Sequence, residues 1–137
     1  DGPPWHPFQR WAMRAEPGLR PSPLGVVIHP VYGLWHAYRA ALLLAEVLPL
    51  PEPDPVEHPC DGCGDRPCLS TCPADALALG AYDVPRCRSY LRAHPDAPCH
   101  SVGCLARRAC PVGREWAQEP AQAAHHTAAF AGGPRQR

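Results

Sequence analysis

Lysine and asparagine are missing from the sequence, so each of its 13 Lys-or-Arg residues is an arginine. Phenylalanine, isoleucine and methionine are scarce, at two, one and one residues. Burial of apolar surface stabilises a fold by about 25 cal/mol per Å², so a chain with few large apolar side chains has a modest core. The arginines balance 13 acidic residues, and the formal net charge is +0. We therefore expect no nucleic-acid partner and no binding to an anionic membrane.

The sequence also lacks the features of a secreted or membrane-spanning protein. It does not begin with a basic segment followed by an apolar run and a small-residue cleavage site. The longest apolar stretch, residues 34–50, is interrupted by His36, Arg39 and Glu46, and it is too short and too polar to cross a bilayer. We expect a cytoplasmic protein without a membrane span.

Proline and glycine are abundant, at 20 and 11 of 137 residues, and they oppose long regular elements. Residues 1–23 contain six prolines and are expected to form an irregular arm. Residues 24–59 are expected to form a second segment, which contains three parts. These are a short strand over 25–28, a helix of good helix formers over 34–48, and a stiff proline-rich connector over 49–59. The cysteine-containing region should thus follow a helical arm.

All eight cysteines lie between Cys60 and Cys110, which marks residues 60–130 as a separate domain. Asp83 and Ser101 are the expected caps of two of its helices. Residues 131–137 are expected to be a flexible tail. The predicted fold class is a small, loop-rich α+β domain that bound metal stabilises, so metal loss should unfold it. Four short helices are expected in it, over residues 73–79, 83–93, 101–109 and 120–130.

The first cysteines follow the pattern C-x2-C-x4-C-x3-C-P, from Cys60 to Pro73. Bacterial ferredoxins have C-x2-C-x2-C-x3-C-P, in which the fourth cysteine binds a different [4Fe–4S] cluster from the first three. Gly62 and Gly64 allow the backbone to wrap closely around a cluster. Pro73 redirects the chain, so the thiol of Cys72 should point away from the first three. The pattern predicts a two-cluster iron–sulfur protein with a ferredoxin-like domain.

The remaining cysteines complete two sets of four. Cys110 is followed by Pro111, which repeats the Cys-Pro ending of the motif. We therefore expect one [4Fe–4S] cluster to be bound by Cys60, Cys63, Cys68 and Cys110. The second [4Fe–4S] cluster is expected to be bound by Cys72, Cys87, Cys99 and Cys104.

Two other uses of eight cysteines remain open. Two structural Cys₄ zinc sites would also consume all of them, and C-x2-C alone is common in zinc knuckles. Zinc sites usually pair one short-spaced knuckle with another, whereas a three-ligand run that ends in Cys-Pro is typical of cubane clusters. Disulfides would require an oxidising compartment, which nothing at the start of the sequence suggests.

Three parts of the sequence resemble the ferredoxin-type domain of the epoxyqueuosine reductase group and of related small dicluster ferredoxins. They are the run from Cys60 to Pro73 with ADAL after it, RCRSYL at residues 86–91, and the late Cys99, Cys104 and Cys110-Pro111. The segment IHPVYGLWH at residues 28–36 is similar to one that precedes the cysteines in such ferredoxins. In the reductase group, the resemblance implies clusters that relay electrons to a cobalamin in a separate preceding domain, where a tRNA nucleoside is reduced.

Electron transfer is the expected function, because no set of general acid, base and nucleophile is visible. Single electrons would pass between a reductase and an acceptor enzyme, so the partners would be redox proteins. An electron-feeding part of a corrinoid-linked oxidoreductase is one alternative, and a structural zinc protein is another. Tyr90 and Trp116 are candidates for shielding a cluster from water.

A few other polar residues have more ordinary expected roles. His29 and His36 should stabilise the turn between them, and His58 should be an exposed loop residue. Arg107 and Arg108 are expected on a solvated helix face. The alternative is that they dock an acidic redox partner or offset the negative charge of a cluster, which would raise its reduction potential.

Overall fold

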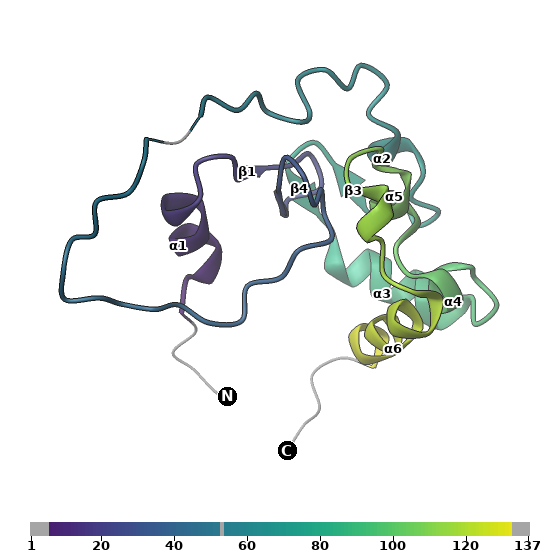
Figure 1. Cartoon of the computed structure of the whole chain (residues 1–137). Helices are drawn as coiled ribbons and strands as arrows, with labels where there is room; N and C mark the ends of the chain where they lie inside the picture. The colour runs from purple at the N-terminus through teal and green to yellow at the C-terminus, as the bar shows by residue number, and fades with distance from the viewer. Residues whose placement is uncertain (1–5, 53, 133–137) are drawn as a thin grey trace.

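Short elements joined by loops make up the computed structural model, which describes residues 6–52 and 54–132. Within these residues there are six α-helices, a 3₁₀ turn (η1) and two two-stranded antiparallel sheets, so the predicted α+β class is confirmed (Figure 1). In chain order the elements are α1 (Phe8–Ala15), β1 (Arg20–Pro21), β2 (Val27–Ile28), α2 (Pro67–Ser70), β3 (Leu77–Ala78), β4 (Ala81–Tyr82), α3 (Val84–Ala93), α4 (Cys99–Val102), α5 (Leu105–Ala109), η1 (Arg114–Trp116) and α6 (Pro120–Ala131).

The first part of the chain is more regular than predicted. Helix α1 lies inside the stretch expected to be an irregular arm, because the prolines flank this helix and do not interrupt it: Pro7 is its N-cap and Pro17 follows it. Ala12 of α1 is buried with Leu19 and Val27, and this small core attaches the helix to the β1–β2 sheet. The strand expected over residues 25–28 is confirmed in part, as β2.

A second core joins this N-terminal part to the cysteine-containing region. Leu24, Ile28 and Leu34 are buried together with Ala106 and Cys110. Half-buried side chains pack against this group. Three of them are cysteines, Cys60, Cys68 and Cys72, and the others are Leu69, Leu77 and Val112. Four of the eight cysteines, Cys60, Cys68, Cys72 and Cys110, are therefore part of this core or pack against it.

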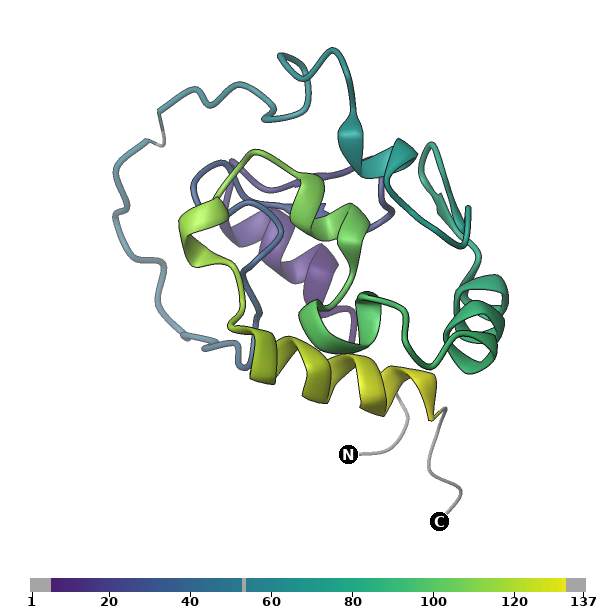
Figure 2. The same ribbon diagram turned by 90° about the vertical axis from the view of Figure 1, so that its right-hand side faces the viewer.

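The predicted helix over residues 34–48 is wrong. The chain after Leu34 runs as a long loop without regular structure, which arcs around the outside of the molecule before it reaches the first cysteine (Figures 1 and 2). Leu42, Leu43 and Val47 are 92%, 90% and 99% exposed. An isolated helix of about 15 residues is marginal in water, and no core covers the apolar side of this segment. Among the described residues, no helix is both long enough and apolar enough to cross a membrane.

The predicted helices of the cysteine-containing region are partly right. Those over 83–93 and 120–130 are confirmed as α3 and α6, and the Asp83 side chain accepts a hydrogen bond from the Arg86 amide as the predicted cap. The helix over 73–79 is wrong: Leu77 pairs with Tyr82 in a tight β3–β4 hairpin. Gly80, at the turn, has φ +74°. That backbone conformation suits a turn and ends any helix.

The single helix predicted over 101–109 is also wrong, because the chain forms two separate helices, α4 and α5. Gly103 separates them, with φ +83°. A Cβ atom at this position would lie 3.0 Å from the Cβ of Ala123, so the glycine lets α4 and α6 approach closely. The flexible tail is predicted to begin at residue 131, but Ala131 is the last residue of α6. Residues 133–137 of that tail lie outside the described part of the chain.

His29 organises the turn that follows β2, as predicted. Its Nδ1 accepts hydrogen bonds from the amides of Val31 and Tyr32, at 2.9 and 3.0 Å. Because Nδ1 is an acceptor, Nε2 carries the proton and donates a hydrogen bond to Oε1 of Glu16, at 2.6 Å. The Tyr38 hydroxyl donates to Oε2 of the same carboxylate, at 2.6 Å. Glu16 therefore holds the start of the long loop against the N-terminal part.

Two glycines meet where the turn after β2 crosses the chain that follows Cys110. Gly33 and Gly113 have φ +57° and +68°. A Cβ atom on Gly33 would lie 2.8 Å from the carbonyl carbon of Val112, and one on Gly113 would lie 2.5 Å from that of Tyr32. Only two residues without side chains allow this approach.

We predict that Gly33→Ala lowers the free energy of unfolding by more than about 2 kcal/mol, because it combines left-handed strain with a backbone clash. Gly80→Ala is the matched control, since Gly80 also has a positive φ (+74°) but has no neighbouring atom within 4 Å of the point that a Cβ would occupy. The control should lose only the strain, about 1 kcal/mol. Thermal unfolding of both variants tests this, and equal losses would contradict the crossing.

We predict that Glu16→Gln removes a pH-dependent part of the stability. Burial raises the pKa of Glu16, but hydrogen bonds from Tyr38 and His29 outweigh it and hold the pKa below its ordinary value of 4.5. A lowered folded-state pKa contributes stability above the unfolded-state pKa and loses it as the pH falls through the folded-state value. The side chain is 41% exposed, so solvent screening limits the effect to about 1 kcal/mol.

The variant should therefore be less stable than the wild type at pH 7 and equally stable near pH 3, as measured by urea unfolding. Glu57→Gln, in the exposed part of the long loop, should change the stability at neither pH. A difference between Glu16→Gln and wild type that stays constant with pH would contradict the role given to the carboxylate.

Candidate metal centres

Four cysteines from three parts of the chain surround one narrow cavity of about 20 Å³, which we call the first site. Cys60 and Cys63 lie on the loop before α2, Cys68 lies in α2, and Cys110 directly follows α5. Arg66 and apolar side chains complete the wall, and the apolar ones are Ile28, Val112 and four prolines: Pro23, Pro59, Pro67 and Pro111. These are the four cysteines that the sequence assigned to one set.

His58 positions the start of the first site, although the sequence predicted only an exposed loop residue. Its Nδ1 accepts a hydrogen bond from the Cys60 amide at 3.0 Å. Its Nε2 donates to the carbonyl of Pro21, in β1, at 3.0 Å. The loop that carries Cys60 is thus fastened to the N-terminal sheet.

The thiols of the first site influence one another. Burial, together with like-charge repulsion from Cys110, Cys68 and Cys63, raises the pKa of the Cys60 thiol to about 11, and Arg66 opposes these effects. Burial, Cys110 and Cys63 also raise the pKa of Cys68. A bound cation would favour the thiolate forms of Cys60 and Cys68.

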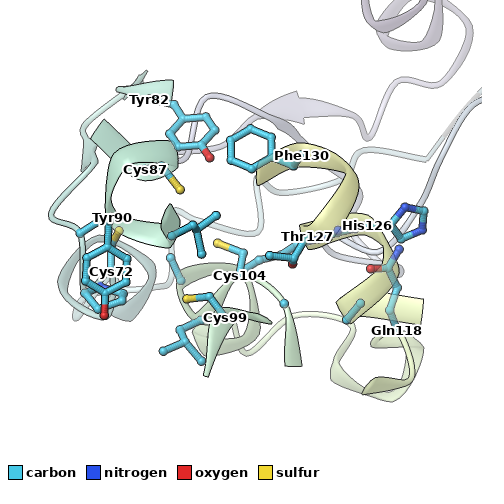
Figure 3. A pocket seen from close by; sticks show the side chains of 18 residues that line it. Cys72, Tyr82, Cys87, Tyr90, Cys99, Cys104, Gln118, His126, Thr127 and Phe130 are labelled. Atoms are coloured by element: carbon cyan, nitrogen blue, oxygen red, sulfur yellow. The ribbon is translucent and has the colours of Figure 1, made fainter. Parts of the chain in front are cut away.

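The other four cysteines surround a larger cavity of about 180 Å³, the second site (Figure 3). The sulfur atoms of Cys87, Cys99 and Cys104 point toward a common space, and Cys72 lines the same cavity from the side of the β3–β4 hairpin. Cys72 thus faces away from the three cysteines that precede it, as expected for the residue before Pro73. Cys72 and Cys110 thus cross between the sites: each lines the cavity opposite to that of the cysteines nearest to it in the sequence.

Short helices and loops orient these sulfur atoms. Cys87 lies in α3, Cys99 begins α4, and Cys104 is the N-cap of α5. Backbone amides face the sulfurs: Ala76 donates to Sγ of Cys72 at 3.5 Å, and Leu105 donates to Cys99. Burial is the largest cause that raises the pKa of both Cys99 and Cys104.

Arg86 holds the Cys72 loop against the helix that carries Cys87. Its Nε donates to the carbonyl of Ala74 at 2.7 Å, and its Nη2 donates to Oδ2 of Asp75 at 3.1 Å. Asp75 has φ +47°, an uncommon value for a residue other than glycine, so the loop is sharply bent there. The arginine stabilises this bend from the start of α3.

The sequence did not identify Tyr82 and Phe130, which cover the second site where β4 and α6 meet. Their rings are stacked, with centroids 6.3 Å apart and an interplanar angle of 17°. The Tyr82 hydroxyl lies beside the sulfur of Cys87 (Figure 3). Burial raises the pKa of Tyr82, and its interaction with Cys87 raises it further, so the phenol keeps its proton at neutral pH. The only indication of this role in the sequence is that Tyr82 directly precedes Asp83, the predicted cap of the next helix.

The expectation that Arg107 and Arg108 lie on a solvated helix face is wrong. Arg107 donates to the carbonyl of Leu34 and lies 4.3 Å over the Trp35 ring. Arg108 donates to the carbonyls of Val102 and Gln118. Both side chains are half-buried, and they connect α5 to the segments around it.

The two candidates for shielding a cluster have different positions. Tyr90 lines the second cavity and stacks on His94, with ring centroids 4.3 Å apart. Trp116 is 52% exposed and packs edge-on against Tyr32, outside the linings of both cavities. Only Tyr90 is therefore placed to exclude water from a cysteine site.

The donor atoms at both sites are soft sulfurs, and the structure has all eight cysteines as free thiols. Thiolates suit zinc and iron–sulfur clusters. Among residues 6–52 and 54–132, no three His, Cys, Asp or Glu side chains are close enough together to hold a single metal ion. Sulfur atoms arranged around a cavity of about 180 Å³ fit a group larger than one ion.

We predict that Arg86→Lys lowers the free energy of unfolding by about 1 kcal/mol, because lysine cannot make both contacts and the lost bond to the Ala74 carbonyl dominates. The ion pair with Asp75 is mostly exposed and should add little. Arg92→Lys, on the exposed side of the same helix, is the control and should change stability by less than about 0.5 kcal/mol. Thermal unfolding that does not distinguish the two variants would contradict the role of Arg86.

The chain as a whole can also be compared with known proteins. Comparisons with models of protein families, with curated proteins and with solved structures returned no match. What the sites bind therefore has to follow from their own residues, which are two sets of four thiols, each drawn from distant parts of one chain.

Proposed function

We propose that this chain is an electron-transfer protein that binds two [4Fe–4S] clusters, one at each cysteine site, within a ferredoxin-like domain. The observation that carries the proposal is the crossing of the two cysteines that precede proline. Cys72 faces the second cavity, whereas Cys110 faces the first. In two-cluster ferredoxins the cysteine of the Cys-Pro pair binds the other cluster in the same way.

Each site offers four cysteine thiols, the number of ligands that a [4Fe–4S] cluster takes. Cys60, Cys63, Cys68 and Cys110 would hold one at the first site, with apolar side chains around them. Cys72, Cys87, Cys99 and Cys104 would hold the other at the second site, where backbone amides face the sulfurs. When bound, each cluster accepts and releases a single electron, and its potential depends on hydrogen bonds to the sulfurs and on solvent access.

The rest of the chain would bind the clusters and exclude water. Tyr90, Leu91 and Phe130 line the second cavity, and Ile28 and Val112 line the first. The partners that fit this function are redox proteins, a reductase that delivers single electrons and an enzyme that accepts them. A reducing, cytoplasmic compartment would keep the eight thiols available.

The test is anaerobic reconstitution of the chain with iron and sulfide, followed by metal analysis and electron paramagnetic resonance (EPR). The wild type should hold about eight irons and eight sulfides and show visible absorption that bleaches on reduction. Cys110→Ala and Cys104→Ala should each retain about half of the iron, because each variant lacks one ligand of a different cluster.

The EPR signals that survive in these two variants should differ, and together they should reproduce the wild-type spectrum. Removal of iron by a chelator should unfold the wild type, as followed by circular dichroism. A colourless protein that binds zinc in place of iron would overturn the proposal. So would a loss of the same signal in both cysteine variants, because that would place Cys104 and Cys110 at one cluster.

A further inference from the structure

The two sites differ in the groups that face their sulfur atoms. At the second site, amides of Ala106 and Arg107 face Cys104, the amide of Leu105 faces Cys99, and that of Ala76 faces Cys72. At the first site, the amides of Cys68 and Leu69 face the sulfur of Cys68, and Arg66 lines the wall with prolines, Ile28 and Val112. Backbone amides thus face sulfur atoms at both sites, and those of Ala76, Leu105, Ala106 and Arg107 do so at the second.

At the second site, a side-chain hydroxyl faces the sulfur of Cys87. Tyr82, at the end of β4, directs its hydroxyl toward this sulfur across the top of the cavity (Figure 3). The hairpin turn at Gly80 and the Asp83 cap of α3 lie on either side of Tyr82. The backbone that carries the tyrosine is thus fixed on both sides.

The tyrosine ring is held in place from the other direction by α6. Phe130 stacks on the ring, as described above. Arg88 of α3 donates to the Phe130 carbonyl at 3.0 Å and lies 4.8 Å from the centre of the Phe130 ring. The Tyr82 side chain is 41% exposed, and its ring is contacted from α6 on one side while the hairpin and α3 fix its backbone on the other.

A hydrogen bond to a cysteine ligand stabilises the more negative, reduced state of an iron–sulfur cluster and raises its reduction potential. We propose that Tyr82 donates such a bond to Sγ of Cys87 and gives the second site the higher reduction potential of the two. The inference rests on the proposed function and adds a direction to it. A single electron supplied by a low-potential donor would reduce the second site first, and an electron that enters at the first site would pass to the second.

The test is a redox titration of reconstituted Tyr82→Phe, followed by EPR. This variant removes the hydroxyl and keeps the ring that stacks on Phe130, so both clusters should still be bound. Of the two midpoint potentials, the higher should fall. At a fixed ambient potential, the ratio of reduced to oxidised second site should decrease about threefold, or about 30 mV at 59 mV per tenfold change.

Tyr32→Phe is the matched control, because Tyr32 packs on Trp116 and lines neither cavity. It should leave both potentials unchanged. Combining Tyr82→Phe with Cys110→Ala, which should retain the second cluster, and with Cys104→Ala, which should retain the first, assigns the shift to a site. The potential should move only in the Cys110→Ala background.

The outcomes separate this inference from the proposed function. A wild type that takes up no clusters overturns both. A fully loaded Tyr82→Phe protein with unchanged potentials overturns only the role of Tyr82, and so does a shift confined to the lower potential. If the double variants do not fold, the single variant with both clusters bound still decides the question.

Discussion

The contact between the backbones of Gly33 and Gly113 is the constraint on which the arrangement of this protein depends. It presses the turn after β2 onto the chain just beyond Cys110, at a distance that no side chain would permit. Ile28 and Leu34, on either side of that turn, are then buried against Ala106 and Cys110. One wall of the first site therefore consists of a segment that contains no cysteine and lies about 30 residues ahead of the first one.

Arginines supply many of the other long-range connections, and each uses its planar donors on backbone carbonyls. Arg86 reaches Ala74, Arg88 reaches Phe130, and Arg107 reaches Leu34. A guanidinium group can donate to a carbonyl and stack on an aromatic ring at once, as Arg107 does with Trp35. A chain with few large apolar side chains and no lysine thus uses its arginines to tie short helices and loops together, where a larger protein would use an extensive core.

The division of the thiols links the fold to the proposed chemistry. The small apolar core and the cysteines occupy the same space, since Cys110 is buried in that core and Cys60, Cys68 and Cys72 pack against it. Under the proposed function, clusters at the two sites would provide rigid contacts where apolar side chains are scarce. The Tyr82 hydroxyl beside Cys87 would then set the order in which the sites accept electrons.

The sequence by itself predicted two sets of four cysteines, because their spacing and the two Cys-Pro pairs follow the two-cluster ferredoxin pattern, and the same two sets line the two cavities. It also determined α3 and α6, whose caps and first-turn prolines are local signals. Only the tertiary structure decided the remaining elements. The 34–48 segment stays extended although its residues favour a helix, because nothing covers its apolar side, and the helix expected over 101–109 breaks at Gly103, where α6 packs closely. The roles of Tyr82, His58 and Arg107 likewise depend on groups far away in the chain, and spacing along a sequence carries no information about such contacts.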